Sequence, residues 1–112
     1  MAIDRAYRAL VEERLAAVCE LKTRAMFGGL GIYAGDKFFA LADDGKLYFK
    51  VDDSNRADFE ARGMGPFVPW DGAPPMGYWE LPPGVIDDPS ELTVWVDKAV
   101  GVAERAKRKK RS

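Results

Sequence analysis

The stretch MFGGLGIYAGDKFFALADDGKLYFKVDD, residues 26–53, decides the fold. It contains three short apolar runs separated by a Gly-Asp turn and an Asp-Gly turn. Apolar runs of this length between such turns are typical of a β-meander, so we expect antiparallel strands over residues 29–33, 38–42 and 47–51. The last of these alternates apolar and polar side chains, which predicts one covered face and one more exposed face.

Helical patterns flank the meander on both sides. Residues 4–20 repeat apolar side chains at three- and four-residue spacing, with Asp4 as a candidate N-cap. Residues 52–55 are rich in capping side chains and predict a short helix that ends at Gly63. At the other end, Asp88 precedes Pro89 and an apolar repeat that starts at Leu92, which predicts a long final helix. Between these helices lies a segment rich in glycine and proline, in which we expect two short strands near residues 67–70 and 76–81.

This order of elements predicts an α+β domain. We expect one antiparallel sheet of about five strands, packed by the N-terminal and C-terminal helices, with one short helix between strands. A chain of 112 residues has the size of a single domain. We expect the domain to cover residues 1–104 and a basic tail to cover residues 105–112.

The composition excludes several kinds of chemistry. The sequence contains no histidine, which removes the commonest general base and the commonest transition-metal ligand. Its one cysteine, Cys19, lies near the apolar stripe of the first helix and is expected to be a small buried side chain. We therefore expect no catalytic residues, no metal and no cofactor. The N-terminus lacks a signal peptide and no apolar run approaches the ~20 residues of a membrane span, so we expect a cytoplasmic protein without a membrane contact.

The net charge of −1 conceals an uneven distribution. Six basic residues lie in the last eight positions, and removing them from the 17 lysines and arginines leaves 11 against 18 acidic residues. The tail is therefore +6 and the body −7. Such a run is either a weak, sequence-independent nucleic-acid contact or a solvated helix end. The candidate contact residues are Arg105, Lys107, Arg108, Lys109, Lys110 and Arg111.

Three glycines, Gly28, Gly29 and Gly31, crowd the start of the meander. A glycine-rich loop can hold a phosphate, but here a strand follows, whereas a phosphate loop opens a helix. We expect these glycines to serve a bulge or a bend where the backbone enters the sheet. Arg24 precedes them and is either an anion contact or, as we favour, the partner of an acid such as Glu80, Asp52 or Asp53.

Aromatic residues are numerous along the strands. A sheet that carries aromatic and basic side chains can stack unpaired bases, but acidic residues outnumber the lysines of the meander. We expect most rings to lie in the core. Tyr48 with either Tyr78 or Trp79 is the candidate for an exposed patch, and we expect that patch to meet protein rather than nucleic acid.

Three segments of the chain together resemble a known family. They are RAMFGGLGIY (residues 24–33), KFFALADDGKLYFKVDDSNRADFEARGMGPF (residues 37–67) and MGYWELPPGVIDDPSEL (residues 76–92). This combination is similar to the N-terminal domain of the TfoX/Sxy family, bacterial regulators associated with natural competence. Longer members carry a second helical domain, so we expect a stand-alone version of the first domain. The motif residues Arg24, Met26, Phe27, Gly28, Gly29, Gly31 and Tyr33 are expected to serve the fold.

The resemblance implies a regulatory role, and the family offers no catalytic residue set. Our first hypothesis is a non-enzymatic interaction domain that acts through contacts with an unknown protein or with a second copy of itself. The second hypothesis is a weak nucleic-acid binder that uses the basic tail. The third is a small-ligand carrier or an enzyme with a pocket between the sheet and residues 63–83.

Overall fold

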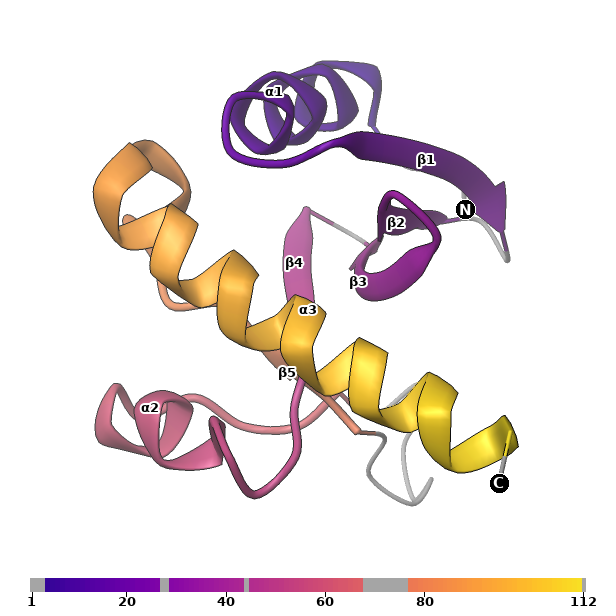
Figure 1. The fold of residues 1–112 in the computed structure, drawn as a ribbon. Coiled ribbons are helices and arrows are strands. Elements are labelled where there is room, and N and C mark those ends of the chain that lie inside the picture. The colour runs from indigo at the N-terminus through magenta and orange to yellow at the C-terminus, as the bar shows by residue number, and fades with distance from the viewer. Residues whose placement is uncertain (1–3, 27–28, 44, 68–76, 112) are drawn as a thin grey trace.

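The computed structural model of the protein describes residues 4–26, 29–43, 45–67 and 77–111. Helices and strands follow one another along the chain as Figure 1 shows. In order they are α1 (Arg5–Ala16), β1 (Leu21–Met26), β2 (Gly29–Ala34), β3 (Lys37–Asp43), β4 (Lys46–Lys50), α2 (Arg56–Ala61), β5 (Tyr78–Glu80), the 3-10 turn η1 (Val85–Asp87) and α3 (Pro89–Arg111).

The five strands form one antiparallel sheet in the order β1-β2-β3-β4-β5. Every strand therefore pairs with its neighbours in the sequence. Two residues separate each strand from the next between β1 and β4, as in β-hairpins, whereas a long segment that contains α2 leads from β4 to β5. With helices at both ends of the chain and a short helix before the last strand, the predicted α+β class is confirmed.

The number of strands was predicted correctly, but the identity of one strand was wrong. The first strand, β1, lies immediately before the meander, where we expected no strand. Of the predicted strand at residues 67–70 only Phe67 is described, and it belongs to no strand, although its N–H donates to the Tyr78 carbonyl at 2.6 Å. The preceding Pro66 forms an isolated bridge with Trp79. The predicted strand at residues 76–81 is the three-residue β5, and Met76 also lies outside.

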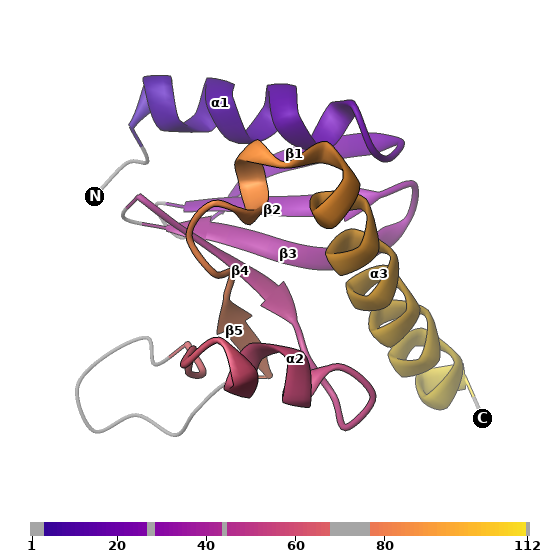
Figure 2. The same cartoon turned by 90° about the vertical axis from the view of Figure 1, so that its left-hand side faces the viewer.

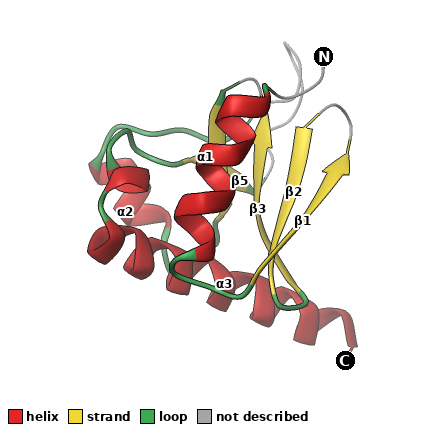
Figure 3. Ribbon diagram, turned by 90° about the horizontal axis from the view of Figure 1, so that it is seen from above, coloured by secondary structure: helices red, strands yellow, loops and turns green. Residues whose placement is uncertain are grey.

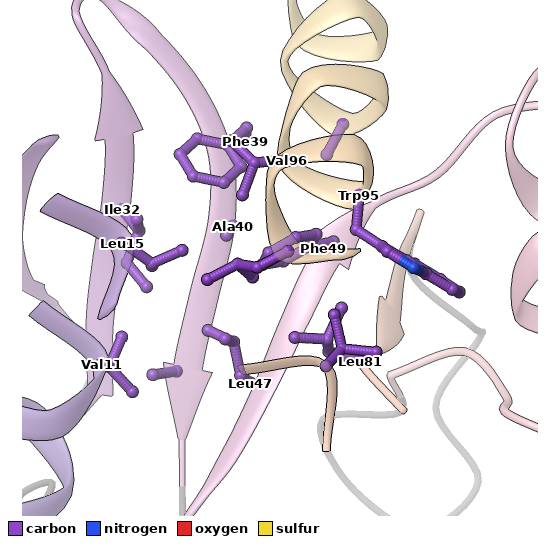
Figure 4. Close-up of a cluster of buried hydrophobic side chains, with 14 of the residues drawn as sticks. Val11, Leu15, Ile32, Phe39, Ala40, Leu47, Phe49, Leu81, Trp95 and Val96 are labelled. Carbon is purple, nitrogen blue, oxygen red and sulfur yellow. The ribbon is translucent and has the colours of Figure 1, made fainter. Parts of the chain in front are cut away.

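All the described helices pack on the same side of the sheet (Figures 1 and 2). Val11 and Leu15 of α1 and Val96 and Ala99 of α3 are buried there. They meet strand residues that alternate along each strand, and Figure 4 shows these side chains interlocking between sheet and helices. We call this side the inner face; its buried strand residues are Leu30, Ile32, Phe39, Ala40, Ala42, Leu47 and Phe49.

A β-bulge in β3 adjusts the packing on the inner face. Ile32 lies opposite Ala40 while Tyr33 lies opposite Phe38, so Phe39 is the extra residue. A bulge turns two successive side chains in similar directions. Phe39 and Ala40 are accordingly both fully buried, and the Phe39 ring meets the Phe49 ring edge-on at 5.4 Å between centroids.

The predicted caps of the first and last helices are formed, whereas Asn55, which precedes α2, makes no side-chain capping hydrogen bond. The Asp4 carboxylate accepts a hydrogen bond from the backbone N–H of Tyr7 at 3.0 Å, and the Asp88 carboxylate accepts from the N–H groups of Ser90 and Glu91. These bonds satisfy donors that the first turn of a helix leaves free. After α2 the chain reverses at Gly63, whose φ of 73° suits glycine.

Gly29 is required by a close approach between neighbouring strands. A Cβ atom at this position would lie 2.5 Å from the carbonyl oxygen of Ala42 on β3, which is shorter than any real contact. The glycine therefore serves the pairing of β2 with β3. The bulge that we expected at the glycines lies instead at Phe39 of β3, and Gly28 lies outside the described residues.

We predict that Gly29→Ala destabilises the protein by about 2 kcal/mol, since the added methyl group must push two paired backbones apart. Urea unfolding followed by tryptophan fluorescence measures the loss. Gly65→Ala is the matched control, because a Cβ there meets nothing within 4 Å, and its stability should change by less than about 0.5 kcal/mol. Equal stability of the two variants would contradict the steric explanation.

Candidate binding surfaces

The face of the sheet opposite the helices carries a set of charged and aromatic side chains. The strand β1 shows which side chains belong to this face. Thr23 points toward the helices, because its Oγ1 donates a hydrogen bond to Glu12 of α1 at 2.7 Å. Because side chains alternate along a strand, Lys22 and Arg24 must point away from α1. The register places Lys22 opposite Tyr33 and Arg24 opposite Gly31, so these residues share that face. We call it the outer face.

Aromatic side chains continue across the outer face. Tyr33 and Phe38 are cross-strand partners whose rings stack at 5.0 Å, and Phe38 reaches the ring of Tyr78 at 5.8 Å. Lys50 lies opposite Tyr78, with its Nζ 5.1 Å from the centre of that ring and 3.4 Å from the hydroxyl. Burial, followed by the nearby Tyr33, raises the pKa of Tyr78, so the phenol stays neutral.

Tyr48 lies in the middle of this face. It pairs with Leu41 on one side and Glu80 on the other, and its ring packs against Phe67 at 4.6 Å. The prediction that Tyr48 forms an exposed patch with Tyr78 or Trp79 is wrong. Tyr78 shares the face but is only 8% exposed, and Trp79 lies on the inner side, 6.3 Å from the ring of Phe59.

The family-motif residues separate into two groups. Gly29, Gly31, Arg24 and Tyr33 lie on β1 and β2, where Gly29 pairs with Met26 across the hairpin. Phe27 and Gly28 lie outside the described residues. Arg24 is exposed, and within the described ranges no acid lies in ion-pair distance of it, so the favoured pairing with Glu80, Asp52 or Asp53 is not made.

A second surface lies between α2 and α3, on the helical side of the molecule. It is a hollow of about 260 Å³ lined by Asp58, Ala61, Arg62, Val94, Trp95 and Lys98, which we call the α2–α3 hollow. Lys98 bridges to Asp58 at 2.7 Å, and Arg62 pairs with Glu91 while lying over the Trp95 ring. Two ion pairs therefore lie on either side of the Trp95 ring, which forms the bottom of the hollow. At its rim Val94 is 51% exposed, the largest exposure of a large apolar side chain in the described part of the chain.

The end of α3 forms a third surface, and it is held against the body of the protein. Figure 3 shows α3 running past the ends of the strands toward the C-terminus. There the Arg105 guanidinium donates to Ser54 Oγ at 2.7 Å and lies 3.3 Å from Asp52 Oδ2, and Lys107 pairs with Asp36 in the turn between β2 and β3. The helix is continuous through residue 105, so the expected tail begins inside α3.

Two of the six candidate nucleic-acid contacts thus have acidic partners within the chain. The hydrogen bonds from Lys107 and then Lys37 hold the pKa of Asp36 well below its usual range. Burial raises the pKa of Asp52, but hydrogen bonds from Ser54 and Arg105 outweigh it and leave the pKa lowered. Residues 108–111 belong to α3, and their side chains lie outside the described part of the structure.

The second hollow, Cys19 and the acidic residues are weaker candidates for a binding or catalytic site. A hollow of about 210 Å³ lies beside the Pro82–Pro83 turn and Tyr7, in the area where we expected a ligand pocket, but it is smaller than the ~300 Å³ typical of ligand sites. The Cys19 Sγ donates to the Leu15 carbonyl at 3.3 Å, and burial raises the pKa of the thiol. No three potential ligands among His, Cys, Asp and Glu lie close enough to hold a metal ion within the described ranges.

The sequence contains a signal for the strand that carries the outer-face cations Lys22 and Arg24. Leu21, Thr23 and Ala25 alternate with Lys22 and Arg24, which is the pattern of a half-covered strand. The exposure of Val94 could also be predicted from the sequence, because Val94 falls outside the apolar stripe of Leu92, Val96 and Ala99.

A five-stranded antiparallel sheet covered on one side by terminal helices defines a small α+β domain with separate sheet and helix surfaces. The family model for the TfoX N-terminal domain matches residues 13–103 of the chain. The protein therefore belongs to the TfoX N-terminal domain family. A search of curated proteins finds no match. Within the described ranges, no helix combines the length and apolar character needed to cross a membrane.

We predict that Asp36→Asn loosens the end of α3, because it removes the acceptor of Lys107. Backbone amide NMR should show reduced helical chemical shifts and faster hydrogen exchange at residues 105–107, with residues 92–103 unchanged. Asp97→Asn is the control, since Asp97 is an exposed acid on α3 with no ion pair to any other described residue.

In the wild-type protein, the helical structure at the end of α3 should depend on pH through the same contact between Asp36 and Lys107. Because the folded pKa of Asp36 lies below its ordinary value of 3.8, its stabilising contribution is present above pH 3.8 and is lost as the pH falls through the folded value. We expect the end of α3 to stay helical down to about pH 4 and to fray below it. Fraying between pH 7 and pH 5 would contradict this assignment.

Proposed function

We propose that this protein is a non-enzymatic regulatory domain that acts by binding another protein, and that the α2–α3 hollow is its binding site. The observation that carries the proposal is the exposed Val94 at the rim of a hollow floored by Trp95 and Arg62. Tryptophan and arginine in a partly enclosed pocket are the residues that most often dominate protein interfaces.

The polar frame supports the same interpretation. The pairs Lys98–Asp58 and Arg62–Glu91 flank the hollow, as polar residues surround the apolar centre of an interface. Exposed ion pairs contribute little to stability, about 0–1 kcal/mol each, so their side chains can move aside when a partner residue enters. An aliphatic or aromatic side chain of the partner would then pack against Val94 and Trp95.

Membership of the TfoX N-terminal domain family and the absence of histidine from the sequence both favour binding over catalysis. We propose a cytoplasmic role in transcription regulation of the kind associated with the TfoX/Sxy regulators. The basic end of α3 is less favourable as a nucleic-acid contact than its sequence suggested, because Arg105 and Lys107 already engage acids of the body.

Site-specific crosslinking tests the proposal. With a photoreactive phenylalanine analogue at Val94, irradiation of cells of the source organism should give a discrete protein adduct that persists after nuclease treatment. The same analogue at Ala57, an exposed position of α2 that does not line the hollow, is the control. Adding Arg62→Ala should reduce the Val94 adduct at least fivefold, because it removes part of the floor.

Three results would overturn the assignment of this site. They are an equal adduct from Ala57, an adduct that disappears with nuclease, and an adduct that is unchanged by Arg62→Ala. Light scattering of the purified protein distinguishes the kind of partner, since self-association through the hollow would give a dimer that Val94→Glu dissociates.

A further inference from the structure

The outer face has a charge opposite to that of the chain. Four cationic residues project from its strands, namely Lys22 and Arg24 on β1 and Lys46 and Lys50 on β4. The acids that share this face on the described strands are Asp43, opposite Lys46, and Glu80, opposite Tyr48. Within the described strands this face therefore carries four cations against two acids, whereas the whole chain has a net charge of −1.

Three acids at the turns that end the strands are paired with cations outside the outer face. Asp36 pairs with Lys37 and Lys107, Asp52 with Arg105, and Asp53 with Arg56. Among the described strand residues of the outer face, cations therefore outnumber acids, in contrast to the count along the sequence of the meander.

Rings and cations alternate across this face. Tyr33 has Lys22 beside it on the edge strand, and Lys50 lies over Tyr78. Tyr48 lies three strands from Arg24, with Gly31 and Leu41 between them. Neighbouring strands are about 4.8 Å apart, so the distance from β1 to β4 is about 14 Å. A platform of this width suits the two or three bases that an aromatic sheet surface stacks.

We propose that the outer face binds single-stranded nucleic acid. Bases stack on the half-buried rings of Tyr33 and Tyr48, and the phosphates contact Lys22 and Arg24, which are exposed. The two cations supply a salt-dependent attraction that does not depend on sequence. The rings select single strands, because a duplex keeps the faces of its bases inside the stack.

This surface is separate from the α2–α3 hollow, which lies on the helical side. The geometry favours nucleic acid over an acidic peptide, because the aromatic rings alternate with the cations as bases alternate with phosphates. Carboxylates alone would bind the cations and make no stacking contact with the rings.

Fluorescence anisotropy with a labelled 12-nucleotide oligouridylate, an oligothymidylate of equal length and a hairpin duplex tests the proposal. At 50 mM salt we expect dissociation constants for both single strands on the order of 10⁻⁵ M and at least tenfold weaker binding of the duplex. Lys22→Gln with Arg24→Gln should weaken single-strand binding about tenfold and reduce the slope of log K against log salt by about 1.4.

A control variant removes an exposed positive charge from α1, by Arg5→Gln, and should bind within twofold of the wild-type protein. Stacking is tested at Tyr48, where Tyr48→Phe should bind nearly as well as the wild type and Tyr48→Ala about tenfold more weakly. Urea unfolding of each variant identifies any loss caused by misfolding, and Tyr33→Leu provides a second stacking test if Tyr48→Ala does not fold.

A chain that ends at residue 107 should retain full single-strand affinity, which separates this surface from the basic end of α3. The proposal is overturned by no single-strand binding at 50 mM salt, by equal affinity for the duplex, or by unchanged binding after the Lys22 and Arg24 substitutions. It is also overturned if a 12-residue polyglutamate displaces the oligonucleotide as effectively as unlabelled oligouridylate, since the site would then recognise acidic charge alone.

Discussion

The structure depends on the burial of one face of a five-stranded sheet under two long helices. Alternation along β2, β3 and β4 supplies the apolar face, and the bulge at Phe39 adds a ring where strict alternation would have turned it away. Val11 and Leu15 of α1 and Val96 and Ala99 of α3 complete the core. Because this burial uses the helices on one side, the charged and aromatic side chains of the other side are left to face outward. Both proposed binding surfaces therefore follow from the same packing.

Much of this arrangement could be predicted from sequence. The Gly-Asp and Asp-Gly turn signals, the Asp4 and Asp88 caps and the apolar repeat of α3 are local, and the structure contains the strands and helices that they predict. The strand β1 was missed because its residues have modest strand propensity, and pairing with β2 decides its conformation. The glycines illustrate the same limit. Their crowding showed that the backbone had a special requirement, but only the pairing of β2 with β3 shows that Gly29 is needed for space.

The candidate surfaces were less accessible to sequence reasoning, for a physical reason. A charge count along the chain treats neighbouring residues as neighbours in space. In the folded protein, Asp36 and Asp52 are held by Lys107 and Arg105, which are 71 and 53 residues away. These contacts between distant residues remove acids from the strands and cations from the tail. The predicted exposed patch was wrong for a related reason, since Tyr78 is covered by Phe38 and Lys50, whose positions depend on register.

The sheet order also affects how the protein behaves at high concentration. In the described part of the structure β1 has one strand neighbour, β2, so its other edge has backbone groups available to another chain. Lys22 and Arg24 place two positive charges on that edge, and two copies approaching edge to edge would bring like charges together. Natural proteins use charged edge strands in this way to prevent sheets from joining. The same two side chains would then protect the protein against aggregation, whatever ligand the neighbouring face binds.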